Sequence, residues 1–167
     1  RELALSFGIF ALSMLIGALS SAMDSEFVNV ILGESYVEMT KQNIESGDPM
    51  AVYKGQGQLS MSMGITVNNL MVAFLTFATG VFFTLGSIVV LIRNGIMVGA
   101  FQYFFIERGL FWDSFLTIWI HGTLEISAIV IAGAAGITVG KGLVFPGAYR
   151  CAQAFQRSAR RGLKIMV

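Results

Sequence analysis

The sequence predicts an all-α fold, a polytopic bundle of helices that cross a membrane. Hydrophobic residues make up 55% of the 167 residues and charged residues 13%, and the mean hydropathy is +0.73. This balance is typical of integral membrane proteins and not of soluble domains. The apolar stretches predict four crossings, one of them short or broken, with short amphipathic helices at the surface.

Residues 3–23 are the first expected span, because they carry no charge. At about 1.5 Å per residue they cover a hydrocarbon core of about 30 Å. We interpret them as a retained anchor and not a signal peptide, since no small-residue cleavage site followed by a soluble domain appears. The chain starts without methionine and stops on an apolar run, which indicates a piece of a longer protein.

Residues 24–64 form the expected outer loop, where acidic side chains outnumber lysines. Apolar side chains recur at helical spacing around 27–32 and 36–44, and Gly47-Asp48-Pro49 ends the second run. We expect two amphipathic helices on or near the outer membrane surface. Their apolar faces fit a cap packed over the bundle, the commoner use of such faces, or a recognition surface for an outer partner.

Residues 65–92 are the second expected span, longer than a perpendicular helix requires, so the helix must tilt or protrude. Asn68 and Asn69 fall in its outer third. An unsatisfied polar group in lipid costs several kcal/mol, so each amide needs a partner or water. Either these amides hydrogen-bond to neighbouring helices, or they line a polar path.

The third expected span, residues 95–110, is the short or broken one and follows an inner turn at Arg93-Asn94-Gly95. Arginines concentrate after Gly147, and the positive-inside rule places them in the cytoplasm. With the acidic loop outside, an even number of crossings must separate Arg93 from that basic segment. Spans 95–110 and 119–145 supply them, which leaves the N-terminus in the cytoplasm.

The fourth expected span, residues 119–145, carries His121 and Glu125 near its outer end. Four positions apart on a helix, their Cβ atoms lie ~5–6 Å from each other, so the side chains can meet. Pairing lowers the cost of a carboxyl group in the membrane, and the pair serves either structure or a proton or ion site. We expect this face to contact Asn68 and Asn69. The predicted polar intramembrane cluster is His121, Glu125, Asn68, Asn69 and Asn94.

Small residues recur at every fourth position further along the same span. Such a stripe lets two helix backbones approach closely. We expect a close helix crossing here, made within the chain or with a second copy, which leaves a homo-oligomer open. The predicted packing residues are Ala128, Ala132, Gly136 and Gly140.

The last expected element is a basic amphipathic helix at residues 148–164, on the cytoplasmic side. A helix of this kind meets anionic lipid headgroups, at about 1 kcal/mol per basic residue near the surface, or docks on another domain. The residues expected to contact lipid or a partner are Arg150, Arg157, Arg160, Arg161 and Lys164.

The sequence predicts no catalytic residue, no metal site and no cofactor. One histidine and one glutamate supply too few ligands for a zinc site, and neither a nucleophile beside a base nor a glycine-rich phosphate loop appears. Cys151 lies at the far end of the fourth span from His121. A net charge of +1 gives no electrostatic case for nucleic acid.

Several motifs stand in a familiar order: Asn68-Asn69, Asn94-Gly95-x-x-x-Gly99-Ala100, His121-Gly122-x-x-Glu125, Ala132-Gly133-Ala134-Ala135-Gly136 and Phe145-Pro146-Gly147. Together they resemble the stage II sporulation protein M family of bacterial membrane proteins. The likeness is strongest from Asn68 to Gly147 and covers most of the chain. Ile120 stands where many members have proline, so nothing forces a helix break there.

This resemblance implies a multi-pass protein of the bacterial plasma membrane with about five spans, the last of them following Val167. The founding member works with a cell-wall hydrolase and its partner in engulfment of the forespore, as a membrane subunit, and the family brings no catalytic residues. We therefore expect a non-enzymatic scaffold with protein partners in the membrane or envelope. The alternative is a transporter or channel component that uses the polar cluster.

Overall fold

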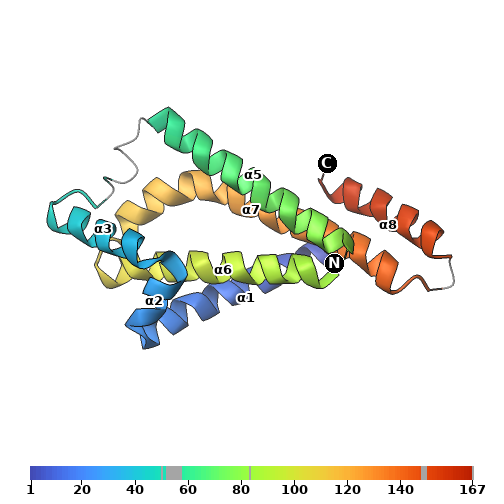
Figure 1. Cartoon of the computed structure of the whole chain (residues 1–167), viewed down its shortest axis with the longest axis horizontal. Coiled ribbons are helices and arrows are strands. Elements are labelled where there is room, and N and C mark those ends of the chain that lie inside the picture. The colour runs from blue at the N-terminus through green and yellow to red at the C-terminus, as the bar shows by residue number, and fades with distance from the viewer. Residues whose placement is uncertain (50, 52–57, 83, 148–149, 167) are drawn as a thin grey trace.

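The structure, a computed structural model, describes residues 1–49, 51, 58–82, 84–147 and 150–166, with the backbone alone at 58–62, 117, 118, 120 and 121. Every regular element in these residues is a helix (Figure 1). Four stretches are long and apolar enough to cross a membrane: Glu2–Met23, Met63–Phe82, Thr84–Glu107 and Gly122–Val144. The predicted all-α class with four crossings is confirmed.

Among the described residues, four long helices form the bundle, and three shorter ones lie at its two ends. The long helices are α1 (Glu2–Met23), α5 (Gln58–Phe82), α6 (Thr84–Glu107) and α7 (Phe111–Val144). The shorter helices are α2 (Ser25–Leu32), α3 (Glu34–Glu45) and α8 (Cys151–Met166).

The boundary between the second and third crossings differs from the sequence prediction. α5 ends at Phe82 and α6 begins at Thr84, so the predicted turn at Arg93-Asn94-Gly95 is wrong. These residues lie inside α6, an unbroken helix of 24 residues, and the third crossing is full length. Arginine is a good helix former, and a single charge does not mark a turn. Asn94 fits the helix because its amide donates to the Val90 carbonyl one turn back, at 2.8 Å.

α7 is longer than a crossing requires, with 34 residues, or about 50 Å at 1.5 Å per residue. The segment predicted between the third and fourth spans forms its first turns. The helix runs through Ile120 without a break, as expected where no proline removes a backbone donor.

Interhelical contacts give the directions of the helices. α1 and α6 run parallel, since Gly95 faces Phe10 and Gly99 faces Met14. α5 and α7 also run parallel to each other and opposite to that pair, and lie side by side in Figure 1. The bundle therefore has a cap end, with α2, α3 and the α6–α7 connection, and a basic end, with the start of α1 and α8.

The pairing of α1 with α6 depends on glycine. A Cβ atom on Gly95 would lie 2.7 Å from the Phe10 carbonyl oxygen, and one on Gly99 would lie 2.9 Å from the Ala18 nitrogen. Glycines four residues apart let two backbones touch in a membrane. The run predicted as a turn is thus the packing face of α6, and Phe10 and Leu91 lie in the buried core beside it.

α2 and α3 form a packed cap at the end of α6. Val28 of α2 and Val37 of α3 are 5% and 3% exposed, and they pack with Phe104 and Phe105 of α6, which are 1% and 0% exposed. Burial of four large apolar side chains removes this surface from water. Of the two interpretations of the amphipathic faces, the structure shows the packed cap.

Candidate functional site

Asn69 of α5 and Glu125 of α7 meet inside the bundle. The Asn69 amide donates to Glu125 Oε2 at 2.7 Å and to the Ile65 carbonyl at 3.0 Å. Both side chains are partly buried. A carboxyl oxygen accepts this bond whether the group is ionised or protonated, so the contact holds the carboxyl group in either charge state.

The pair lies near the cap end of the crossing. Glu125 is three residues into the Gly122–Val144 stretch and Asn69 is six into Met63–Phe82, which is roughly 5 Å and 9 Å along each helix axis. A carboxyl group costs less at this depth than at mid-membrane.

The structure places Asn68 and Asn94, two other members of the predicted polar cluster, away from this contact. Asn68 is exposed, and Asn94 bonds within α6 to Val90. The backbone of His121 is helical, one turn before Glu125, while its side chain lies outside the described residues. Within the described part of the cluster, the side chains of Asn69 and Glu125 are in direct contact.

Buried hydroxyl groups join the helices below this pair. Ser87 of α6 donates to the Thr76 carbonyl of α5 at 2.6 Å, and Ser6 of α1 donates to the Val130 carbonyl of α7 at 2.7 Å. Such bonds satisfy polar groups that lipid cannot satisfy. Thr84 Oγ1 is the buried side-chain polar atom for which the described residues supply no hydrogen-bond partner.

The small-residue stripe of α7 lies mostly inside the bundle. Ala132, Gly136 and Gly140 are buried, whereas Ala128 is exposed. A Cβ atom on Gly136 would lie 3.0 Å from the Thr76 carbonyl oxygen, and one on Gly140 would lie 2.8 Å from the Thr84 nitrogen. The stripe thus holds α7 against α5 and α6 within one chain.

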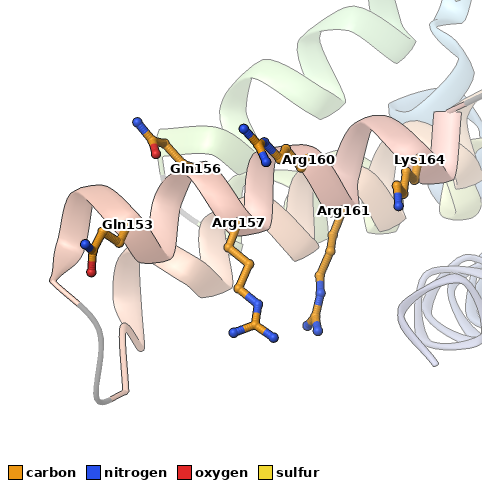
Figure 2. A pocket seen from close by; sticks show the side chains of 6 residues that line it. All are labelled: Gln153, Gln156, Arg157, Arg160, Arg161 and Lys164. Atoms are coloured by element: carbon orange, nitrogen blue, oxygen red, sulfur yellow. The ribbon is translucent and has the colours of Figure 1, made fainter.

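α8 folds back along α7 through small residues. Ala154 and Gly162 are buried; a Cβ atom on Gly142 of α7 would lie 3.1 Å from the Ala154 carbonyl oxygen, and one on Gly162 would lie 2.7 Å from Val139 Cγ2. The basic residues point away from this contact (Figure 2). A hollow of about 370 Å³ lies along them, lined by Gln153, Gln156, Arg157, Arg160, Arg161 and Lys164.

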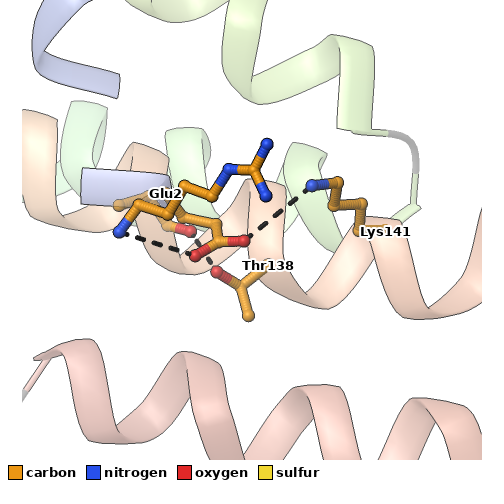
Figure 3. A network of polar contacts seen from close by, with 5 residues as sticks. Glu2, Thr138 and Lys141 are labelled. Carbon is orange, nitrogen blue, oxygen red and sulfur yellow. Dashed lines mark hydrogen bonds and ion pairs between the residues drawn. The ribbon is translucent and has the colours of Figure 1, made fainter. Parts of the chain in front are cut away.

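A polar contact also joins α1 to α7 at the basic end. Lys141 Nζ lies 3.8 Å from Glu2 Oε1 (Figure 3). Both side chains are partly exposed, at 54% and 32%, so the ion pair contributes at most ~1 kcal/mol. Arg150, predicted to contact lipid or a partner, is exposed beside α8.

The described residues contain no group of three or more histidine, cysteine, aspartate or glutamate side chains that would hold a metal ion.

The comparisons with known proteins identify the family of this chain. A family model described as Stage II sporulation protein M matches residues 6–167. The chain belongs to the stage II sporulation protein M family. No curated protein and no solved structure matches it.

Membership in the stage II sporulation protein M family extends over the whole bundle and α8. With four membrane-length helices, this makes the chain a membrane protein. The match includes the α8 segment as well as the four crossings.

The sequence analysis did not anticipate the role of Gln102 in this stage II sporulation protein M chain. Gln102 of α6 accepts a hydrogen bond from Trp119 Nε1 at 2.8 Å and donates to Ser114 Oγ at 3.2 Å. These two hydrogen bonds connect the start of α7 to the cap end of α6. The available signal was Gln102 itself, the one amide side chain in the apolar run Ile96–Ile106.

Proposed function

We propose that this protein is a non-enzymatic membrane subunit, a packed helical scaffold that holds partner proteins at both surfaces of the plasma membrane. Enzymes that remodel the cell wall are the partners that fit the family resemblance. The polar pair Asn69–Glu125 then serves to position α5 against α7, and the chain itself carries out no reaction.

The close packing of the four long helices carries this proposal. Backbone meets backbone where Gly99 faces α1 and where Gly136 faces the Thr76 carbonyl of α5, and Ser87 and Ser6 cross-link helices through their hydroxyls. Close-packed interiors of this kind are rigid and leave few spaces for solute. Rigidity is what a platform for other proteins requires.

Hollows at the surface agree with this interpretation. One lies along the basic side of α8. A smaller one of about 110 Å³ lies at the cap end, between α1, α2, α3 and α6. Neither is lined by Asn69 or Glu125, so both belong to surfaces open to partners and not to a route through the bundle.

The proposed orientation puts the cap end outside and the basic end in the cytoplasm. Lys141 and the basic residues of α8 lie at one end, and Asp24, Glu26 and Glu34 lie at the other. This distribution agrees with the positive-inside rule. The exposed cations of α8 then face anionic headgroups or a cytoplasmic partner, and the cap faces the cell-wall side.

Cross-linking in native membranes tests the scaffold. The full-length tagged protein is cross-linked in its own host and captured, and its partners are identified by mass spectrometry. Arg160→Glu combined with Arg161→Glu reverses charge on the outward side of α8 and is expected to remove cytoplasmic partners while leaving outer ones. Cys151→Ser, an exposed change on the same helix that alters no charge, is the matched control. Recovery of no protein partner at either surface would exclude the scaffold.

A second candidate is a transporter or channel component. The Asn69–Glu125 contact favours it, because carboxyl groups inside a membrane often belong to proton or ion paths. This candidate requires Glu125 to change charge or to bind a solute during transport. A flux measurement separates it from the scaffold, as set out in the Discussion.

A further inference from the structure

Arg93 is a charged side chain at mid-membrane depth on the outside of the bundle. It lies nine residues from Thr84 and fourteen from Glu107, the ends of α6, which is about 14 Å and 21 Å along the helix axis. Leu91, two residues earlier, packs against Gly133 of α7, and Gly133 is the central residue of the Gly122–Val144 stretch. Arg93 therefore lies close to the middle of the crossing.

The surroundings of Arg93 are apolar and open. Its side chain is exposed, and it forms no ion pair or hydrogen bond with the part of the chain that the structure describes. Positions one helical turn away share its face: Val89 is 62% exposed and Met97 is 43% exposed, and Leu85 beyond them is 70% exposed. This stripe of α6 would face lipid if nothing covered it.

An arginine left in that position is costly. Insertion scales put a charged side chain at the centre of a membrane helix at about +2.5 to +3.5 kcal/mol, and such groups almost always pair with another group or face a protein interior. Long basic side chains reach the membrane surface only from positions near a helix end. Arg93 is far from both ends of α6, so it needs an anion at its own depth.

A second copy of this chain does not supply that anion. Copies in one membrane share an orientation, so residues of equal depth meet. Among the described residues of the crossings, Glu125 is the carboxylate that does not stand at a helix end; it is bonded to Asn69 and lies nearer the cap end than Arg93. A symmetric contact through α6 would bring Arg93 toward Arg93, and like charges repel. Lipid phosphates lie at the membrane surface, beyond the hydrocarbon that surrounds Arg93.

We propose that the outward stripe of α6 around Arg93 is the docking site for a transmembrane helix of a partner protein that carries an aspartate or glutamate at mid-membrane. The guanidinium and the carboxylate form a charge-assisted, bidentate pair, which is strong and directional in low dielectric. Val89 and Met97 pack against apolar side chains one turn either side of that carboxylate. This inference rests on the proposed role as a membrane subunit and adds where and how a partner binds.

Photo-cross-linking of the full-length protein in its native membranes tests the site. A photoreactive amino acid replaces Val89 or Met97 on the stripe, and the control position is Phe74 of α5, 68% exposed and without a charge nearby. We expect adducts from the two stripe positions, and none from Phe74, with one protein that mass spectrometry identifies and whose membrane helix contains a carboxylate. Adducts with lipid alone, with a second copy, or with another segment of this chain would overturn the proposal.

Charge variants test whether the partner helix binds the stripe through Arg93. Arg93→Leu keeps the stripe apolar and is expected to lower the adduct yield on the order of tenfold or more, whereas Arg93→Lys, which keeps the charge but not the bidentate geometry, is expected to give an intermediate yield. Arg93→Glu is expected to bind only when the partner's carboxylate is changed to arginine. Protein abundance and membrane insertion are measured in parallel. Both are expected to be unchanged by Arg93→Leu, because removal of a charge from a membrane-spanning helix does not impair its insertion. A yield that Arg93→Leu leaves unchanged would overturn the proposal.

The two proposals fail in different ways. If partners are captured at the cap or at α8 but not at the α6 stripe, the scaffold stands and the docking site is wrong. If no partner is captured at any of the three places, both proposals are wrong.

Discussion

Asn69 donates a hydrogen bond of 2.7 Å to Glu125 across the interface between α5 and α7. The two residues are 56 positions apart in the sequence. Their contact fixes the position of α5 along the axis of α7. Interhelical hydrogen bonds in membranes contribute about 0.6 kcal/mol on average and up to ~1.7 kcal/mol. The pair therefore sets the register of two parallel helices more than it sets the total stability.

Asn69→Ala is expected to lower the free energy of unfolding by about 0.6–1.7 kcal/mol, because Glu125 loses its donor. Unfolding by sodium dodecyl sulfate in mixed micelles measures this change. Asn68→Ala is the matched control: the neighbouring side chain is exposed, and its loss should cost less than ~0.5 kcal/mol. Equal losses for the two variants would contradict a specific Asn69–Glu125 contact.

Glu125→Gln is expected to leave flux unchanged in proteoliposomes, since the glutamine side-chain oxygen still accepts the bond from Asn69. The scaffold requires no proton or ion to bind here. If the protein were a transporter that uses this carboxyl group, flux would fall by on the order of 10²–10⁴, the contribution of a group that transfers protons. Partner capture by the same variant shows that it is folded and inserted.

Gly99→Leu is expected to separate α1 from α6. The new side chain would meet backbone atoms of Met14 and Ala18, which cannot rotate away as a side chain would. Overpacking of this kind costs about 1–3 kcal/mol. The matched control is Gly8→Leu on α1, where a Cβ atom would find nothing within 4 Å. Thermal unfolding in detergent compares the two, and equal melting temperatures would contradict the glycine contact.

Val139→Cys with Gly162→Cys is expected to form a disulfide in a Cys151→Ser background, because Gly162 of α8 lies directly against Val139 of α7. Disulfides require Cβ atoms roughly 3.5–4.5 Å apart. Loss of maleimide labelling after mild oxidation measures the bond. Val139→Cys with Leu163→Cys is the control, since Leu163 is 56% exposed. Equal bonding in both pairs would show that α8 does not hold one position on α7.

Sequence reasoning predicted the number of crossings correctly because apolar length indicated three of them and the positive-inside rule required a further one between Arg93 and the basic segment. It missed where the second crossing ends, because the chain passes from Phe82 to Thr84 without a glycine, proline or charge to mark a turn. The charge of Arg93 and the glycine at Gly95 are typical of a turn between two spans, and this pattern led to the wrong boundary. Both residues lie inside α6, where Arg93 is exposed and Gly95 packs against α1.

The contact between Asn69 and Glu125 could be predicted only in part from the sequence. Helical spacing and equal depth were enough to expect Glu125 near Asn69, but not to choose Asn69 over Asn68, since a rotation of 100° between neighbours decides which side chain points inward. The sequence pattern of α8 places Cys151, Phe155 and Ala159 on one side of the helix, and this is not the side that packs. Its small residues Ala154 and Gly162 face α7, whereas hydrophobicity alone favours Phe155.

The pairing of α1 with α6 has a consequence for how the chain is made. Met14 and Gly99, which meet in the finished bundle, are 85 positions apart, and at ~5–20 residues per second the ribosome needs several seconds to reach the second after the first. During that interval α1 lacks the glycine face of α6 that it packs against in the finished bundle. The α1–α6 pair therefore cannot form until α6 has been synthesised, so this part of the bundle is completed only after the intervening helices have been made.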